Sequence, residues 1–509
     1  MRVLRARRPA TPPTNDIEAA KASRAVSRRS VLLAGASFAG VGAWMVIDGR
    51  RSEPAAAEGA ESVRSFVSTD VTMPVLTATR SGATAPGKIF VDSQQSGTQV
   101  AMIVDDRGEP YWIRPADSGI LNVHPQKLDG RTVLAYWDGD AIGGFGAGTM
   151  RILDSSYGTL HSIDTLGGEP VDLHENQLTD DGTLLALAQV VRRADLSAIG
   201  GPADGWLRDC HVYEVDLKSG AATRRWVASD DIDLDESYLG LDDDEKLNGS
   251  SRDTPYDAYH VNSVQAYGDS LLLSVRHTHA LCSVHRTSGA LQWRMGGKRS
   301  DFDIAADAAF EWQHHARWRS DTELALFDNH TRSGADLSVS SAKFLTVDLT
   351  ARTVKLRRAL RRDDTSGPSE GSVAPAGDGH EIVSFGSGDR VTEFDADGNP
   401  VLDITGFHAT YRAYRTDWVG RPSTLPDIAT RSAGNGRMRV YASWNGATEV
   451  VAWEVLAGQT PTALRRVRRM RRSGFESTAL IRRADHVAVR ALDRDGTVLA
   501  TSKTVQTAT

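Results

Sequence analysis

Apolar and polar residues alternate in short runs along most of the chain after residue 60, and long runs with a helical period are scarce. Gly and Asp punctuate the runs, which is typical of strands joined by tight turns. Six segments share one form: an alternating strand, a polar turn that usually contains Asp and Gly, and a second strand. They begin at Met102 ("MIVDDRGEPYWI"), Arg151, Val212, Cys282, Leu345 and Val391. The pattern predicts repeated β-hairpins.

Each hairpin belongs to a larger unit. A short apolar strand such as "RTVLAYW" or "GTLLALAQV" precedes most hairpins, and an entry strand such as "HENQLT" or "HVNSVQA" precedes several of those. The unit is therefore about four strands, repeated six times at intervals of roughly 47 to 70 residues. Four-stranded sheets repeated radially form a β-propeller, so we predict an all-β fold with a six-bladed β-propeller. A sandwich or solenoid is the alternative, although the unit is too long for a β-helix turn.

The repeat stops near Trp418, and the end of the repeat gives the predicted domain boundaries. The propeller is expected over 61–420, and a Pro-, Gly- and Ser-rich linker over 421–434. Short alternating strands then fill 435–509, which predicts a small C-terminal β-sandwich of immunoglobulin or fibronectin type.

Residues 1–60 are predicted to form a targeting segment. Arg28 and Arg29 directly precede an apolar run, Val31 to Ile47, and Ala-x-Ala-like cleavage options follow. This arrangement is typical of a twin-arginine export signal, so we expect a secreted or cell-envelope protein. The alternative is an uncleaved membrane anchor at residues 31–47, although a run of this length is short for a spanning helix.

Charge and cysteine content exclude some classes of protein. The net charge of −7 argues against a general nucleic-acid binder, whose footprint would be basic. Cys210 and Cys282 lack the spacing of a zinc site, and either one disulfide or two buried thiols would fit them.

Three histidines recur at about one blade's spacing. His174 lies in "VDLHENQLT", His260 in "YHVNSV" and His314 in "FEWQHHARW", so each falls in a successive predicted unit. In a propeller, the entry strands line the central channel, so three consecutive blades would each contribute one histidine. Asn262 follows His260 by two residues on the same strand face, and Arg276 lies one strand further on.

Three interpretations of this set stay open. Each histidine could be an inner-strand residue hydrogen-bonded to a neighbouring blade. The set could instead be a three-histidine metal site, which an arginine among the ligands would oppose. Finally, Arg276 and the imidazoles could bind an oxyanion that one imidazole attacks.

The segments "DLHENQLTDDGTLL", "YHVNSV…SVRHT", "SGALQWRMGGKRSDF", "FEWQHHARW…ALFDNHT" and "YRAYR" together resemble the arylsulfotransferase (arylsulfate sulfotransferase) family. The closer similarity is to the branch found in actinobacteria and fungi, because "SWNGATEVVAWEVLAG" resembles a segment of that branch's C-terminal β-sandwich. The resemblance runs from about residue 65 to the C-terminus. It implies a six-bladed propeller that moves a sulfuryl group from a phenolic sulfate donor to a phenol acceptor. Neither a nucleotide donor, a metal nor another cofactor is expected.

The resemblance also assigns roles to the residues. It implies that His314 is transiently sulfated, and that His174, His260, Asn262 and Arg276 surround the sulfuryl group. Two displacements through a covalent intermediate give ping-pong kinetics. Arg276 would neutralise the sulfuryl oxygens, and His174 or His260 would protonate the leaving phenolate. We therefore expect His314, His174, His260 and Arg276 to be catalytic and Asn262 to bind substrate.

Two positions depart from the family pattern. His315 replaces an acidic residue after His314, and His330 stands where a small residue is commoner. A lost carboxylate would remove an orienting partner of the catalytic histidine. Strand alternation predicts that His315 faces away from His314 as a packing residue. Trp312 and Trp318 could stack on aryl groups, and outward or interblade packing is the alternative that each one taken singly favours.

Two other functions compete with sulfuryl transfer. One is a non-catalytic exported propeller that binds a ligand or cell-surface partner through its channel. The other is a metal-dependent hydrolase or lyase in the same channel. The first predicts ligand-induced stabilisation without turnover, and the second predicts activity that a chelator removes.

Overall fold

The computed structural model describes residues 63–330 and 339–507, and these residues are almost entirely β-structure. The only α-helix among them is the four-residue α1 (Ala228–Asp231), beside four short 3-10 turns. The predicted all-β class is confirmed. The expected targeting segment lies outside the described residues. No helix in the described part of the chain is long and apolar enough to cross a membrane.

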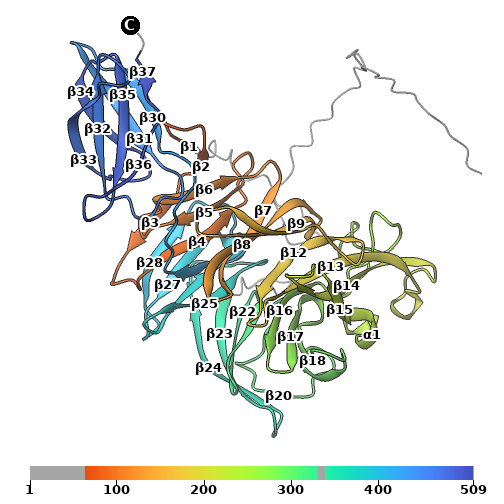
Figure 1. Ribbon diagram of the computed structural model, residues 1–509. Coiled ribbons are helices and arrows are strands. Elements are labelled where there is room, and N and C mark those ends of the chain that lie inside the picture. Colours follow the sequence, from red (N-terminus) through yellow and green to blue (C-terminus); the bar gives the residue numbers. More distant parts are fainter. Residues whose placement is uncertain (1–62, 331–338, 508–509) are drawn as a thin grey trace, which may run out of the picture. The chain divides into compact units, whose positions relative to one another are not determined.

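Antiparallel sheets follow one another along the chain (Figure 1). A small ladder, β1 (Val63–Ser65) and β2 (Thr72–Pro74), precedes them. The first four-stranded sheet comprises β29 (Tyr414–Thr416), β4 (Lys88–Ser93), β5 (Val100–Val104) and β6 (Pro110–Pro115). A nine-stranded sheet follows, comprising β7 (Gly119–Leu128), β8 (Arg131–Ile142), β9 (Phe145–Leu153), β10 (Thr159–Ile163), β11 (Thr165–Leu166), β12 (Glu169–Leu178), β13 (Thr183–Ala194), β14 (Gly205–Asp216) and β15 (Ala222–Val227). Its two halves are joined by one pair, Val171 with Gly148.

Three more sheets complete this part of the chain. The first contains β16 (Val261–Tyr267), β17 (Ser270–Val275), β18 (Ala280–His285) and β19 (Leu291–Gly296). The second contains β21 (His314–Ser320), β22 (Glu323–Asp328), β23 (Ser341–Asp348) and β24 (Thr353–Arg361), with β20 (Asp303–Ile304) added at its edge. The third contains β25 (Ser372–Gly377), β26 (His380–Ser384), β27 (Arg390–Phe394) and β28 (Pro400–Thr405), with β3 (Thr77–Arg80) added at its edge.

The first strands of these units contact one another in a cycle. The successive contacts run β7, β12, β16, β21, β25 and β29, and β29 contacts β7 again and pairs with β4 of its own sheet. In addition, β3 from the start of the chain pairs with β28 near the end. Strands from both ends therefore interlock, and the arrangement is propeller-like.

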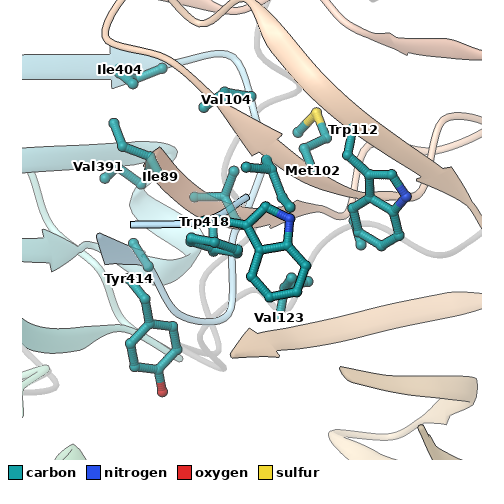
Figure 2. Close-up of a cluster of buried hydrophobic side chains, with 14 of the residues drawn as sticks. Ile89, Met102, Val104, Trp112, Val123, Val391, Ile404, Tyr414 and Trp418 are labelled. Atoms are coloured by element: carbon teal, nitrogen blue, oxygen red, sulfur yellow. The ribbon is translucent and has the colours of Figure 1, made fainter. Parts of the chain in front are cut away.

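A core shared by the two ends supports this closure (Figure 2). Ile89 and Met102 from β4 and β5 belong to the same buried cluster as Val391 and Ile404 from β27 and β28. The Trp418 ring meets Phe90 edge-on at 6.0 Å between centroids. Burying each such aliphatic side chain stabilises a fold by roughly 1.5–3 kcal/mol, so the join rests on packing as well as on strand pairing.

The inner strands do not alternate regularly. His260 and His315 both have left-handed backbones, at φ of 53° each, and the pairing register shifts between Val261 and Ser263 and between His314 and Arg317. Such bulges re-aim side chains and are common beside functional sites. Strict alternation is therefore not a valid guide to where these histidines point.

The last eight strands form two further antiparallel sheets, coloured blue in Figure 1. One contains β30 (Asp427–Ser432), β31 (Arg437–Ser443) and β34 (Ser477–Arg482); the other contains β33 (Arg465–Arg471), β32 (Ala452–Gly458), β35 (His486–Leu492), β36 (Val498–Thr501) and β37 (Val505–Gln506). Val440, Trp453 and Val489 from both sheets share one buried cluster. Strand β30 lies within the predicted linker 421–434, where it pairs with β31.

Candidate active site

Four of the five predicted site residues lie close together around the inner strands. His174 is in β12, His260 directly precedes β16, and His314 begins β21. The rings of His174 and His260 are 5.0 Å apart between centroids. Arg276 follows β17 in a 3-10 turn, and its charge acts on both His260 and His314. Residues from well-separated parts of the sequence thus share one electrostatic environment.

The protonation of His314 is set by an amide. Its Nδ1 lies 2.7 Å from Oδ1 of Asn329, and the Asn329 amide nitrogen donates to the carbonyls of Gly367 (2.6 Å) and Glu370 (2.9 Å). Because Nδ2 faces two acceptors, Oδ1 must be the atom that faces His314, and it can only accept. The hydrogen of a neutral His314 is therefore on Nδ1, and Nε2 carries the free lone pair.

His174 and His260 are held by carboxylates instead. Asp172 Oδ1 lies 2.5 Å from Nδ1 of His174, and Asp257 Oδ2 lies 2.7 Å from Nδ1 of His260. Both carboxylates are fully buried. A carboxylate on Nδ1 fixes the ring orientation and stabilises the imidazolium that forms when Nε2 takes a proton. These two histidines are therefore suited to proton transfer, whereas the neutral amide beside His314 favours a nucleophile.

Arg276 is oriented by a fourth histidine. His277 Nδ1 lies 2.7 Å from the carbonyl of Asp257, and its Nε2 lies 2.9 Å from Nη1 of Arg276. The guanidinium also lies 4.9 Å from the centre of the Trp312 ring. Burial lowers the pKa of Arg276 to about 10, so the side chain stays charged at neutral pH. His277 thus acts as a positioning residue, which the family motifs did not single out.

Burial also keeps two of the histidines neutral. Desolvation, followed by the charge of Arg276, lowers the pKa of His314 well below its ordinary value. Desolvation, followed by the field of His174, does the same to the pKa of His260. A neutral imidazole is the nucleophilic form, so His314 is ready to react at neutral pH.

Asn262 lies near the start of β16 and contacts the backbone directly before His314. Its amide nitrogen donates to the carbonyl of Gln313, the residue before His314, over 2.8 Å. The amide nitrogen keeps a second hydrogen, and Oδ1 is buried without a hydrogen-bond partner among the described residues. The geometry therefore makes Asn262 a brace between β16 and the start of β21.

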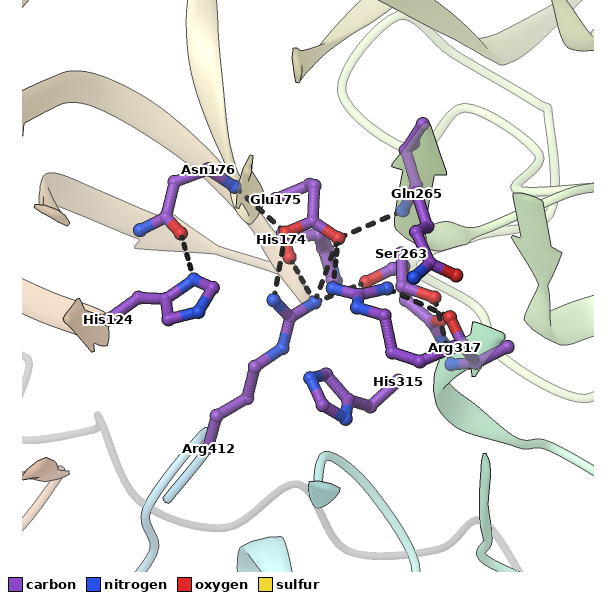
Figure 3. Close-up of polar contacts among 12 residues, drawn as sticks. His124, His174, Glu175, Asn176, Ser263, Gln265, His315, Arg317 and Arg412 are labelled. Atoms are coloured by element: carbon purple, nitrogen blue, oxygen red, sulfur yellow. Dashed lines mark hydrogen bonds and ion pairs between the residues drawn. The ribbon is translucent and has the colours of Figure 1, made fainter. Parts of the chain in front are cut away.

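A buried ion network supports the site strands (Figure 3). Glu175 accepts from Arg317 over 2.7 Å and from Arg412 over 2.9 Å. Arg412 also donates to the carbonyls of His174 (2.8 Å) and Asn262 (3.0 Å). These contacts lower the pKa of Glu175 to about 2 against the effect of burial. Three inner strands that carry site residues are thereby joined through one carboxylate.

Glu370 is a site residue that the sequence analysis missed. Its backbone carbonyl holds Asn329, and its carboxylate accepts from Gln94 at 3.0 Å. Burial raises its pKa to about 7, while the charge of His174 opposes that shift. A carboxyl group that titrates near neutrality beside a reactive cluster is a candidate proton carrier. No motif around "PSEGS" marks it in the sequence.

The tryptophans divide into two roles. Trp312 is half-buried beside Arg276, as an aryl-stacking residue would be. Trp318 packs edge-on against Trp293 at 6.3 Å, within a separate buried cluster.

Within the described residues, Asp257, His260 and His277 form the group with the best spacing for a metal ion. A metal bound at about 2.1 Å holds two ligand atoms roughly 3.4 Å apart, but Asp257 and His260 meet at 2.7 Å. His277 Nδ1 is also committed as a donor to a carbonyl. The arrangement suits a hydrogen-bonded triad better than a metal centre. Cys210 and Cys282 are both buried free thiols.

Comparisons with known proteins agree with the motifs. The chain has similarity to solved structures of a putative 6-phosphogluconolactonase from Bacteroides fragilis (12% identity, 66% of this chain and 100% of that one, TM-score 0.32) and the Pan2 WD40 domain from Neurospora crassa (8%, 72% and 86%, TM-score 0.32). No curated protein matches it. The family model described as arylsulfotransferase (ASST) matches residues 124–407, more than half of the chain, and this range contains all five predicted site residues. The chain therefore belongs to the arylsulfotransferase family.

Proposed function

We propose that this protein transfers a sulfuryl group from a phenolic sulfate ester to a phenol through a sulfated His314. Membership of the family supports nucleotide-independent arylsulfotransferase activity at the level of the family. The observation that carries the finer proposal is the Asn329 contact. This contact leaves the free lone pair of a buried, neutral His314 on Nε2, in the electrostatic field of Arg276.

The first half-reaction forms an N–S bond and breaks an S–O bond. His314 Nε2 attacks the sulfur atom, and the phenolate leaves with the electron pair of the S–O bond. Arg276 offsets the negative charge on the three non-bridging oxygens. The leaving phenolate takes a proton from His174, whose partner Asp172 stabilises the protonated ring, whereas His260 is neutral.

The second half-reaction reverses these steps. The acceptor phenol attacks sulfur, its proton passes to the same histidine, and His314 leaves as a neutral imidazole. Atoms and charges balance without any further reactant.

We propose a six-bladed propeller as the scaffold, followed by a small C-terminal β-sandwich. The cyclic order of inner-strand contacts supports the blade count, and the core shared by two sheets supports the sandwich. Export through the twin-arginine pathway, with anchoring by residues 31–47 as the alternative, stays a proposal based on sequence. So does placement in the actinobacterial and fungal branch.

The test uses purified protein, p-nitrophenyl sulfate as donor and a phenol as acceptor. We expect acceptor-dependent release of p-nitrophenol with ping-pong kinetics, and a loss of roughly a thousandfold or more in His314→Ala. His285→Ala is the matched control, because the His285 ring bonds to the nearby Ser288 in a hairpin turn.

Intact mass spectrometry after donor exposure, without acceptor, should detect a sulfuryl adduct that His314→Ala lacks. Donor binding without release of p-nitrophenol would instead favour a ligand-binding propeller. Release that survives His314→Ala would refute the role of His314.

A further inference from the structure

A polar cavity lies among the inner strands, and none of the three clustered histidines lines it. It has a volume of about 330 Å³ and is lined by residues of β7, β12, β16, β21, β25 and β29. The side chains relevant here are His124, Gln177, His315, Arg317, Arg319 and Tyr414. None of the five predicted site residues lines this cavity, and Glu175 and Arg412 tie its Arg317 to the carbonyls of His174 and Asn262 (Figure 3).

Arg317 brings incompletely balanced positive charge to the cavity. Arg317 and Arg412 share a single carboxylate, Glu175, which is fully buried. The group therefore has one positive charge more than it has negative charges. Figure 3 shows Arg317 and Arg412 converging on Glu175, with His124 and His315 beside them.

Arg319 repeats this imbalance. It shares the half-buried Glu381 with Arg358, at 3.4 and 3.3 Å. Its Nε atom is buried and has no hydrogen-bond partner in the described part of the chain. No Asp or Glu is among the described residues that line the cavity. The third arginine of the lining, Arg415, is paired with Asp106 and Glu393. Two incompletely paired guanidinium groups thus border a space that contains no protein anion of its own.

His315 adds an unsatisfied donor. Its side chain is 3% exposed, its Nε2 lies 3.3 Å from the Tyr414 hydroxyl, and its Nδ1 has no partner among the described residues. In the tautomer in which Tyr414 donates its hydroxyl hydrogen to Nε2, the His315 hydrogen is on Nδ1, and the hydroxyl oxygen accepts from Arg412. Buried donors in folded proteins are almost always paired, so this one indicates a missing acceptor.

Two stacked aromatic rings border the cavity. The rings of His124 and Tyr414 stack at 4.0 Å between centroids with 9° between their planes. The cavity's volume is at the small end of the range for ligand pockets and suits a single ring with one charged group.

We propose that this cavity is a binding site for a small aromatic oxyanion, a ring that carries a carboxylate or sulfate group. The oxyanion meets Arg317, Arg319 and His315, and the ring lies against the rings of His124 and Tyr414. The site is separate from the sulfuryl-transfer centre and does not depend on the proposed reaction. It also gives His315, the departure from the family motif, a ligand-binding role in place of the packing role that strand alternation predicts.

Benzoate is the probe, because it matches the proposed class and carries no sulfuryl group to transfer. Binding is measured by isothermal titration calorimetry on the full chain at constant ionic strength. Gln177→Glu is the main variant: it keeps the side chain's size and adds a carboxylate that competes for the two arginines. Arg319→Gln is the second. Arg276→Gln is the matched control, because it removes the arginine of the histidine cluster.

We expect benzoate to bind the wild-type protein and Arg276→Gln within about twofold of each other, and at least tenfold more weakly to Gln177→Glu and Arg319→Gln. Circular dichroism checks that each variant is folded. If Arg319→Gln does not fold, the affinity of Gln177→Glu for benzoate decides the test. No binding by the wild type, or loss in Arg276→Gln with retention in Gln177→Glu, overturns the proposal. Inorganic sulfate is the second arm; tighter binding of sulfate than of benzoate would refute the aromatic part.

Discussion

The buried pair of Glu175 and Arg412 offers a quantitative test of how the site strands are held together. Arg412 is 1% exposed and donates to Glu175 and to the carbonyls of His174 and Asn262. Arg412→Met keeps much of the side-chain volume but removes every one of these donors. Removing one partner of a buried ion pair typically costs about 3–5 kcal/mol, because the other charge stays buried.

The pKa of Glu175 gives an independent magnitude. Its ionised form is stabilised in the folded state, where the pKa is about 2 compared with an ordinary value of 4.5. At 1.36 kcal/mol per pKa unit, the shift corresponds to about 3 kcal/mol of stability at pH 7. Because the folded pKa is depressed, this stability is present above pH ~4.5 and is lost as the pH falls toward ~2. The two estimates agree in size.

The assay is denaturant unfolding of wild type and Arg412→Met at pH 7 and at pH 3. We expect a loss of about 3–5 kcal/mol at pH 7 and less than half of that difference at pH 3. Arg421→Met is the control, because Arg421 is paired with Glu449 at the surface, 70% and 36% exposed, and such pairs contribute about 0–1 kcal/mol. If Arg412→Met resembled Arg421→Met at pH 7, the argument that this network holds the inner strands would be refuted.

Three further predictions concern the chemistry. Arg276→Lys keeps the charge but loses the planar fork, so kcat/KM should fall by about a hundredfold at unchanged thermal stability; an unchanged kcat/KM would contradict oxyanion binding by the guanidinium. Asp257→Asn weakens the orientation of His260 and should lower kcat by roughly 10- to 100-fold while the sulfuryl adduct on His314 still forms, which mass spectrometry would detect. Glu370 has a folded pKa of about 7, above its ordinary 4.5, so its charged form destabilises the fold. Between pH ~4.5 and ~7 the unfolding free energy of the wild type should therefore decrease relative to that of Glu370→Gln, by at most about 3 kcal/mol. Denaturant unfolding of both proteins at pH 5 and at pH 8 measures this change. If the difference between the two proteins is the same at both pH values, the pKa of Glu370 is not raised.

Much of the site could be anticipated from histidine spacing, but its protonation could not. The recurrence of His174, His260 and His314 at one-blade intervals brings them to neighbouring inner strands, as the cycle of strand contacts requires. The partners Asp172 and Asp257 lie two and three residues away from their histidines. No motif in the sequence marks these two aspartates as partners of the histidines. Asn329 is a strand away from His314 and takes over the orienting task that the family pattern suggests for an acid at position 315.

The alternation argument assumed regular strands at residues where the strands are bulged, although His315 does line a cavity that His314 does not. The rule that side chains i and i+2 share a face assumes a regular strand, whereas the register shifts beside both His260 and His314. As a result Asn262 braces the carbonyl of Gln313, and His315 lines a different cavity with Tyr414. Local sequence does not mark these bulges, because histidine and asparagine tolerate both backbone conformations.

The sequence by itself determined the all-β class, the hairpin repeat, the family and the set of histidines, because these follow from period-two alternation, turn residues and short motifs. Only the tertiary structure decided which atoms of those histidines are free. That choice depends on partners contributed by distant strands and turns, and on burial that no local pattern encodes. The free lone pair on His314 follows from its contact with Asn329, and the raised pKa of Glu370 follows from desolvation. The unbalanced charge around Arg317 and Arg319 arises because each shares one carboxylate with a second arginine.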